Sequence, residues 1–241
     1  MIDIHCHILP EIDDGSSCLE ESLDMAQIAV QSGVTDIIAT PHFRGEEESL
    51  EQKERFARRY EKLKAALARE GSPLKLHLGA EILCLPQTVE LAERHQLPTL
   101  AGTEYVLTEF YFDESFDFMD RMLEQIANCG YRIVVAHPER YDAIQFQPEL
   151  LEKWARRGYV LQVNKGSILG VLGRGAEQTA GAMMEMGLVH LFASDAHSSR
   201  HRTPNMGQIV RWAQTYCTPE CAQILLGENP RRVLKGKSMA Q

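Results

Sequence analysis

The chain has 241 residues and a formal net charge of −9, from 25 basic and 34 acidic side chains. Hydrophobic residues at 44% and charged residues at 24% are ordinary globular proportions, which exclude a disordered or fibrous chain. The acidic balance argues against a nucleic-acid partner, because proteins that bind the phosphate backbone carry a basic footprint. No apolar run approaches the length of about 20 residues that crosses a bilayer, so we expect no membrane insertion.

Six cysteines are scattered along the chain, and no two of them form a CxxC pair. In a chain of this length, this distribution is typical of reduced thiols and not of a disulfide framework. The N-terminus lacks the basic and apolar regions of a secretory signal. Together these features predict a cytoplasmic protein.

Seven short runs rich in Val, Ile and Leu have the length of strands and alternate with longer helical patterns. Their continuous apolar character is typical of parallel strands that are covered on both faces. The predicted strands are Met1–His5, Val34–Thr40, Leu74–Gly79, Tyr105–Thr108, Arg132–Ala136, Tyr159–Val163 and Leu188–Ala193.

The intervening helices are marked by glycines that follow each amphipathic stretch and act as stop signals. The segment Ser17–Glu20 has the spacing of a capping box and predicts the start of the first helix. Further helices are predicted over Glu46–Arg69, Phe116–Cys129, Glu149–Arg157 and Ala176–Met186.

This alternation favours a parallel α/β architecture, and about seven strand–helix units favour closure into a barrel. An open doubly wound sheet is the main alternative, although no GxGxxG motif follows the first strand. The chain shows no internal linker or composition break. We therefore expect one domain over residues 1–241, with a frayed tail over 235–241.

Histidine and acidic side chains follow six of the seven predicted strands, and this is the strongest functional signal in the sequence. In α/β barrels the active site is built at the carboxyl ends of several strands. Residues i and i+2 of an extended segment point to the same face, so His5 converges with His7, and Asp195 with His197. Together with Asp14 from the turn after the first strand, the candidates are His5, His7, Asp14, His42, Glu81, Glu109, His137, Asp195 and His197.

Imidazoles and carboxylates without a thiolate are a donor set that suits borderline divalent ions such as Mn, Fe or Zn. Nine donors are too many for one ion and predict two or three ions that share bridging carboxylates. One histidine at a strand end is more often a hydrogen-bonded structural residue, but the joint pattern favours a metal site. For the other histidines we expect structural roles at His77 and His190 in strand runs and at His95 in a helix, and His201 is left unassigned.

These segments resemble, in the same order, the motifs of the polymerase-and-histidinol-phosphatase (PHP) superfamily. The resemblance extends from Met1 to about Arg231, and the Ala136–Tyr141 segment favours the bacterial protein tyrosine phosphatases associated with capsular and exopolysaccharide synthesis. It implies a distorted (β/α)7 barrel of the TIM type with a trinuclear site, often of manganese, that the nine residues hold. The matching segments are Met1–Pro10, Asp13–Gly15, Thr40–His42, Ala136–Tyr141 and Ser194–His197.

The same resemblance implies that Arg140 and Arg202 hold the substrate phosphate. The implied substrate is phosphotyrosine in the tail of a cognate bacterial tyrosine kinase. The planar fork of an arginine matches two phosphate oxygens, and Arg140 follows His137 by three residues. Lys165 and the pair Ser198–Ser199 depart from the pattern that we expect for this family, but they leave the predicted ligands intact.

The expected reaction is hydrolysis of a phosphomonoester by a metal-bridged hydroxide, with metal contacts that neutralise charge on the phosphoryl oxygens. Cysteine-dependent tyrosine phosphatases need an arginine six residues after the nucleophile, and none of the six cysteines has one. Two alternatives stay open. One is a small-molecule phosphoesterase resembling histidinol phosphatase, and the other is a non-catalytic, metal-stabilised interaction module.

Overall fold

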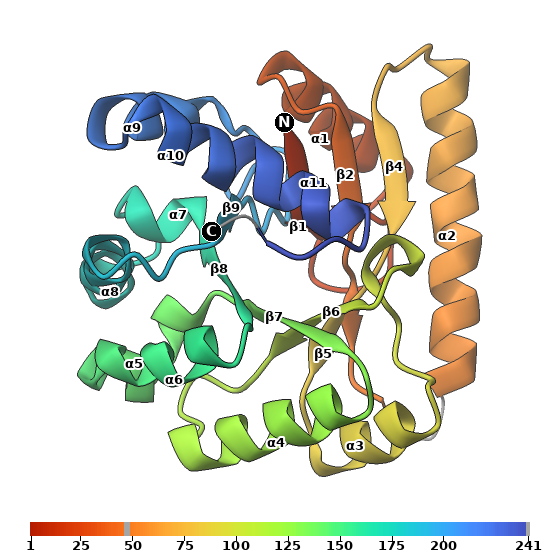
Figure 1. Cartoon of the computed structure of the whole chain (residues 1–241). Helices are drawn as coiled ribbons and strands as arrows, with labels where there is room; N and C mark the ends of the chain where they lie inside the picture. The colour runs from red at the N-terminus through yellow and green to blue at the C-terminus, as the bar shows by residue number, and fades with distance from the viewer. Residues whose placement is uncertain (46–48, 240–241) are drawn as a thin grey trace.

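The strands of the computed structural model, which describes residues 1–45 and 49–239, all pair in parallel (Figure 1). They form a sheet in the order β1-β2-β4 and a second sheet in the order β3-β5-β6-β7-β8-β9. The strands are β1 (Ile2–Cys6), β2 (Asp36–Ala39), β3 (His42–Phe43), β4 (Lys75–Leu78), β5 (Glu81–Leu83), β6 (Tyr105–Glu109), β7 (Arg132–Ala136), β8 (Val160–Asn164) and β9 (Leu191–Ala193).

The two sheets are continuous with one another and close into a barrel of seven strand positions. β3 follows β2 after two residues, and β5 follows β4 after two residues, so each pair is one interrupted strand. The backbone bond from Glu81 N to Pro41 O, 3.0 Å, continues the ladder across these interruptions. A bridge between Cys6 and Ala196 joins the end of β1 to the segment after β9. The predicted distorted (β/α)7 barrel is therefore confirmed.

Pro41 and Gly79 account for the two interruptions in the folded structure. Pro41 has no N–H and cannot donate to a ladder, which ends β2 before it. A Cβ atom at Gly79 would lie 2.9 Å from a methyl carbon of Leu100 and 3.0 Å from one of Ile38, so glycine is required there by close approach. The breaks fall directly before His42 and Glu81, two of the predicted site residues.

Helices cover the outside of the barrel (Figure 1). Four further helical segments are the 3-10 helices η1 (Leu100–Gly102), η2 (Pro138–Arg140) and η3 (Pro148–Leu150) and the π-helix η4 (Ile224–Glu228). In the described ranges, no helix combines the length and apolar character that a membrane crossing needs. The α-helices are α1 (Leu19–Gln31), α2 (Ser49–Arg69), α3 (Pro86–Glu93), α4 (Phe116–Asn128), α5 (Asp142–Phe146), α6 (Leu151–Arg156), α7 (Lys165–Ile168), α8 (Arg174–Glu185), α9 (Gly207–Tyr216), α10 (Pro219–Gln223) and α11 (Asn229–Leu234).

Several predicted boundaries need correction. The capping box at Ser17–Glu20 is wrong, because Cys18 is the N-cap and the Ser17 hydroxyl donates to Glu21 Oε2 at 2.7 Å instead. The last strand begins at Leu191, so residues 188–190 precede it. The helix predicted over 149–157 is divided between η3 and α6. The predicted start of the second helix, over residues 46–48, lies outside the described residues.

The inner row of side chains is apolar at the amino end of the barrel and polar at the carboxyl end. A buried cluster that includes Leu107, Val160 and Ala193 fills the amino end, and α11 packs across it against β1. Two residues after Leu107 and Val160, the same face of β6 and β8 carries Glu109 and Gln162, because strand side chains alternate with a period of two. Asp195 follows the end of β9 and joins this polar layer. The tightly packed amino end of the barrel thus supports the polar layer at its carboxyl end.

Candidate metal centre

All nine side chains predicted as ligands lie together at the carboxyl end of the barrel. Their donor atoms form four overlapping groups, and within each group the atoms lie within 4.8 Å of one another. Members shared between groups join the four into one continuous cluster. The groups are His7, Asp14, His42 and His197; His5, His7 and Glu81; His5, His137 and Asp195; and His42, Glu81 and Glu109.

Glu81 lies at the centre of this cluster and is 1% exposed. Its Oε1 lies 3.2 Å from His5 Nε2 and 2.9 Å from His137 Nε2. Its Oε2 lies 3.2 Å from both His7 Nε2 and His42 Nδ1. Burial acts to raise the pKa of Glu81, but the surrounding imidazoles outweigh it and hold the pKa well below its usual range. A carboxylate that faces four imidazoles and belongs to two of the four groups is a central candidate ligand.

The rings of His5 and His7 face one another through their Nε2 atoms, which are 3.2 Å apart. The Nδ1 atom of His7 lies 2.9 Å from Asp13 Oδ2, and that of His5 lies 2.9 Å from Gln162 Oε1. Because both acceptors engage Nδ1–H, these tautomers leave the Nε2 lone pairs directed at each other and at Glu81. A cation bound between them satisfies this arrangement, so the donor set fits a metal centre.

Asp195 connects the histidine cluster to Arg140 and Arg202, the two arginines predicted to bind the substrate phosphate. Its Oδ2 accepts from Asn164 Nδ2 at 2.6 Å and pairs with both Arg202 and Arg140, the latter at 3.6 Å. Its Oδ1 is buried and has no hydrogen-bond partner among the described residues. That oxygen lies 3.4 Å from His5 Nε2. An unpartnered, buried carboxylate oxygen beside ring nitrogens fits a site for a cation.

His197 completes the outer side of the cluster, and its ring stacks on that of His7 at 3.9 Å. Burial lowers the pKa of His197 to about 4. Its ring is therefore neutral near pH 7 and keeps the lone pair that a ligand needs. Its Nε2 lies 3.5 Å from Asp14 Oδ1, which also lies 3.2 Å from His42 Nε2.

Two of the site residues have strained backbones. His137 has a φ of 35° and Asp195 a φ of 49°, in the left-handed region that non-glycine residues rarely adopt. Both follow a barrel strand, where this conformation turns the chain over the cluster. Such strain persists when surrounding contacts hold it and is concentrated at functional sites.

Sequence reasoning missed four residues that hold the cluster in place: Asp13, Glu139, Gln162 and Asn164. Glu139 is buried, and its Oε1 accepts from Ser167 Oγ at 2.6 Å and from the backbone N–H of Asn164 at 3.0 Å. These bonds fix the turn that carries Arg140 to the end of β8. The available signal was the presence of Gln162 and Asn164 in an otherwise apolar buried strand, where polar groups must have partners.

The other histidines lie outside the four groups, as expected. His77 in β4 pairs with Asp36 at 3.0 Å, and His190 Nδ1 accepts the backbone N–H of Leu161 at 3.1 Å. Two placements were wrong. His95 lies in the turn after α3 with a φ of 54°, and His190 directly precedes β9. The backbone N–H of His201 donates to Ser198 Oγ in the loop next to Arg202.

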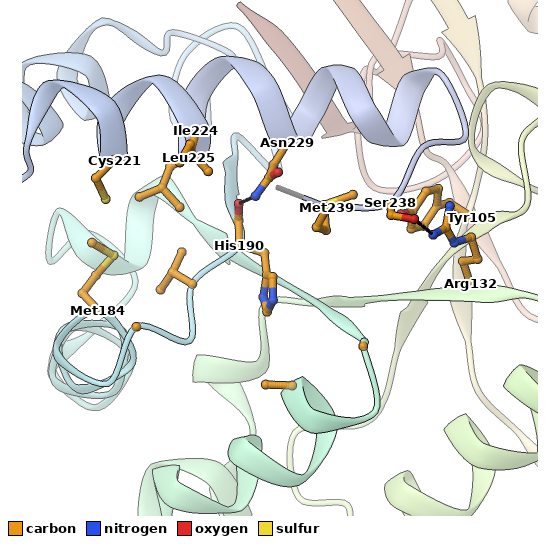
Figure 2. Close-up of a pocket in the computed structure, with 14 residues that line it drawn as sticks. Tyr105, Arg132, Met184, His190, Cys221, Ile224, Leu225, Asn229, Ser238 and Met239 are labelled. Carbon is orange, nitrogen blue, oxygen red and sulfur yellow. Dashed lines mark hydrogen bonds between the residues drawn. The ribbon is translucent and has the colours of Figure 1, made fainter. Parts of the chain in front are cut away.

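A hollow of about 580 Å³ lies at the other end of the barrel and contains none of the nine side chains. Figure 2 shows it beneath the C-terminal helical segment, with Tyr105 and Arg132 on one side and Met184 and Cys221 on the other. Tyr105 and Arg132 are the first residues of β6 and β7, so this hollow belongs to the amino end. Barrel active sites lie at the opposite, carboxyl end.

The fold and the cluster together define a seven-stranded α/β barrel with a candidate metal-binding donor set at its carboxyl end. Residues 1–235 match the model of the family described as "Capsular polysaccharide synthesis, CpsB/CapC". This match covers nearly the whole chain. The protein belongs to the CpsB/CapC family.

Curated relatives and solved structures agree with this assignment. The chain is 36% identical over 204 residues to the tyrosine-protein phosphatase YwqE of Bacillus subtilis, a match that covers 84% of this chain and 79% of YwqE. It is 30% identical over 240 residues to the tyrosine-protein phosphatase CpsB of Streptococcus pneumoniae, covering 97% and 98% of the two chains.

One structure from the work on B. subtilis YwqE and S. pneumoniae CpsB, which names them metal-dependent tyrosine phosphatases, superposes with a TM-score of 0.88. That superposition covers 100% of this chain and 96% of the other, at 30% identity. A Listeria monocytogenes lactonase superposes with a TM-score of 0.60 at 12% identity, which reflects the barrel fold alone.

Proposed function

We propose that this protein is a metal-dependent phosphomonoester hydrolase that removes phosphate from phosphotyrosine. The observation that carries the proposal is the cluster of five imidazoles and four carboxylates, most of them buried, with two arginines on the Asp195 edge. The names of YwqE and CpsB, both tyrosine-protein phosphatases, support the same activity.

The nine residues of the cluster would hold two or three divalent ions. Mn²⁺ is the first candidate, with Fe or Zn as alternatives, because the donors are nitrogen and oxygen atoms without a thiolate. When bound, such ions act as Lewis acids toward phosphoryl oxygens and acidify a water molecule enough to supply the nucleophile. Gln162 and Asp13 keep the rings of His5 and His7 in the tautomer that presents Nε2 to an ion.

Arg140 and Arg202 bind and orient the phosphate in this proposal. Both guanidinium groups approach Oδ2 of Asp195, so a phosphate bound next to this carboxylate can contact both of them. A planar guanidinium bonds two phosphate oxygens with fixed geometry, which aligns the phosphorus for in-line attack. Asn164 Nδ2 donates to the same Oδ2 of Asp195 at 2.6 Å and keeps the carboxylate that anchors the arginines in place.

The cysteines have no role in this chemistry. Cys6 lies nearest to the cluster in sequence, but it is fully buried, and burial raises the pKa of its thiol well above its usual range. A thiol that stays protonated is a poor nucleophile. All six cysteines are free, which supports a reducing, cytoplasmic location for the protein.

The partner that we propose is the phosphotyrosine tail of a bacterial tyrosine kinase that takes part in capsule or exopolysaccharide synthesis. A disordered tail suits the site, because the cluster lies among loops at the barrel end, where an extended segment can reach it. We further propose that residues 1–241 form one domain, since a single barrel wall includes strands from Ile2 to Ala193.

Hydrolysis of a phosphotyrosyl peptide by the purified protein tests this function. We expect activity to disappear after chelation, to return with Mn²⁺, and to survive alkylation of the thiols with iodoacetamide. Elemental analysis of the purified protein identifies the bound ions and their number. Full activity in metal-free protein would contradict the proposal.

The rival functions give different outcomes in the same assay. A small-molecule phosphoesterase hydrolyses histidinol phosphate faster than the peptide. A non-catalytic module binds the phosphopeptide without turnover, and His42→Ala leaves that binding intact. Under the proposed function, His42→Ala abolishes hydrolysis because His42 contributes to two of the four donor groups.

A further inference from the structure

A small open hollow lies beside the cluster of candidate metal ligands. Tyr111 and Phe112 form its aromatic wall. It has a volume of about 210 Å³, and its lining includes His42 and Glu109 of the cluster together with Leu83, Tyr111 and Phe112. An enclosed apolar cavity of about 150 Å³ accommodates benzene. The hollow is therefore large enough for one phenyl ring next to the cluster.

The aromatic wall is exposed to solvent. Tyr111 is 54% exposed and Phe112 is 44% exposed, whereas the neighbouring Phe110 is 2% exposed and packs in the core. Two adjacent, exposed aromatic side chains form an apolar patch, and such patches mark binding surfaces when they lie together. Here they follow Glu109, the last residue of β6, after the one intervening residue Phe110.

The position of Phe112 is fixed by contacts on both sides. Its carbonyl accepts the backbone N–H of Asp142 at 2.8 Å, which ties the loop after β6 to the segment after Arg140. Its ring lies edge-to-face with the ring of His137, with 6.1 Å between centroids. The Phe112 ring is thus held in place before any ligand arrives, which lowers the entropic cost of binding.

Arg140 connects this wall to the phosphate position. Its guanidinium carbon lies 4.3 Å from the centroid of the Phe112 ring, and Nη1 lies 3.6 Å from Asp195 Oδ2. One side chain therefore contacts an aromatic face and points toward the place where the phosphate would bind. In an aryl phosphate the ring and the phosphate share one oxygen, so the two must bind at adjoining positions.

We propose that the hollow bounded by Tyr111 and Phe112 binds the aromatic ring of phosphotyrosine and selects aryl over alkyl phosphates. This inference rests on the proposed function, because it needs the phosphate to lie between Arg140 and the cluster. Aromatic pairs in edge-to-face or offset geometry contribute beyond the area that they bury. Alkyl phosphates, including phosphoserine and histidinol phosphate, do not place an aromatic ring at this distance from phosphorus.

Calorimetric binding of phenylphosphonate and methylphosphonate to the Mn²⁺-loaded protein tests the inference without turnover. We expect phenylphosphonate to bind about tenfold more tightly. We expect Phe112→Leu and Tyr111→Ala each to reduce that ratio severalfold, with the methylphosphonate affinity of Tyr111→Ala within twofold of the wild type. Phe146→Leu is the matched control, because Phe146 is 84% exposed on α5 and does not line the hollow.

Equal affinities for the two phosphonates, or a ratio that neither variant changes, would overturn the inference. That result leaves the proposed function standing if the wild-type protein still hydrolyses phosphotyrosyl peptide. Failure of the proposed function is a separate observation, namely the absence of metal-dependent hydrolysis of any phosphomonoester. Circular dichroism of both variants checks that a changed ratio does not come from misfolding.

Discussion

The carboxylate of Asp13 accepts a hydrogen bond from Nδ1 of His7 at 2.9 Å, which leaves Nε2 of the same ring to face the cluster. Asp13 accepts two further bonds, from the backbone N–H of His42 at 3.0 Å and from that of Gly15 at 3.0 Å. All three partners are donors. Asp13 therefore orients one predicted ligand and also fixes the backbone that carries a second.

Replacing Asp13 with asparagine is expected to weaken metal binding by about 10- to 100-fold. The amide offers one acceptor and one donor group where the structure presents three donors, so an N–H is directed against another N–H. Competition of the purified variant with a chromogenic chelator measures the affinity for Mn²⁺. Asp24→Asn, an exposed change on α1, is the control and should behave as the wild type does.

An unchanged Mn²⁺ affinity in Asp13→Asn would contradict this role. If the affinity falls while thermal unfolding in excess chelator is unchanged, the effect belongs to the site and not to general stability.

The nine ligand candidates were predictable because they lie at the ends of the apolar runs or, for Asp14, in the turn after the first run, and parallel strands of a barrel place their carboxyl ends together. Their supporting residues were not predictable in the same way. Asp13 is adjacent to Asp14, and nothing in the sequence distinguishes a carboxylate that orients a histidine from one that binds a metal ion. Gln162 and Asn164 were recognisable only as polar residues in a buried strand, and the partners of such residues depend on the barrel register.

The architecture was readable from the alternation of apolar runs and glycine-terminated helices, but the interruptions were not. A run such as Val34–Thr40 reads as one strand, and its continuation as β3 at His42 depends on the pairing of His42 with Glu81 of the neighbouring strand β5. The cap of α1 also shows the limit of local patterns. Ser17 and Glu20 have capping-box spacing, yet the tertiary path places Cys18 at the N-cap.

Metal binding should stabilise the folded protein, since the cluster is assembled from residues far apart in the chain. A ligand at 100 times its dissociation constant adds about 2.7 kcal/mol to the free energy of unfolding. For a domain of this size, we expect Tm to rise by about 5–10 °C when Mn²⁺ is added to chelated protein. Differential scanning calorimetry over a series of Mn²⁺ concentrations measures the shift.

Two histidine variants make that measurement specific. His42→Ala removes a donor from two groups and should reduce the Mn²⁺-dependent shift. His77→Gln alters a histidine that pairs with Asp36 outside the cluster and should keep the full shift. A Tm that does not respond to Mn²⁺ in the wild-type protein would rule out this linkage.

Lys165 links the end of β8 to the loop that carries Arg202. Its Nζ donates to the carbonyls of Thr203 at 2.5 Å and Asn205 at 2.6 Å. Arg202 precedes these carbonyls directly, and its own carbonyl accepts the backbone N–H of His197 at 2.8 Å. The lysine that departs from the expected family pattern thus acts on the loop and not on the cluster.

We expect Lys165→Met to weaken binding of inorganic phosphate about tenfold, because hydrogen bonds from a charged donor contribute about 1.5–3 kcal/mol. Affinity for Mn²⁺ should stay within twofold, since the donor groups are untouched. Calorimetric titration with phosphate and with Mn²⁺ separates the two effects. Lys75→Met, an exposed change in β4, is the control, and equal phosphate binding by the two variants would exclude this positioning role.

His190 gives the protein a dependence of stability on pH that is separate from the metal cluster. Burial lowers its pKa from the ordinary value of 6.5. Its Nδ1 accepts the backbone N–H of Leu161 at 3.1 Å, and a protonated ring has no lone pair for that bond.

The sign of this effect follows from proton linkage. Below about pH 6.5 the unfolded chain binds a proton at His190 that the folded protein does not bind, so the free energy of unfolding falls as the pH decreases. Between pH 7.5 and 5.5, we expect the free energy of unfolding of His190→Asn to fall by about 1 kcal/mol less than that of the wild type. The asparagine oxygen accepts the hydrogen bond from the Leu161 N–H and does not titrate. Urea unfolding of both proteins at the two pH values measures the difference, with the exposed His201→Asn as the matched control. If His190→Asn and wild type lose stability equally over this range, the folded protein accepts the proton at His190 and the bond to Leu161 does not control its titration.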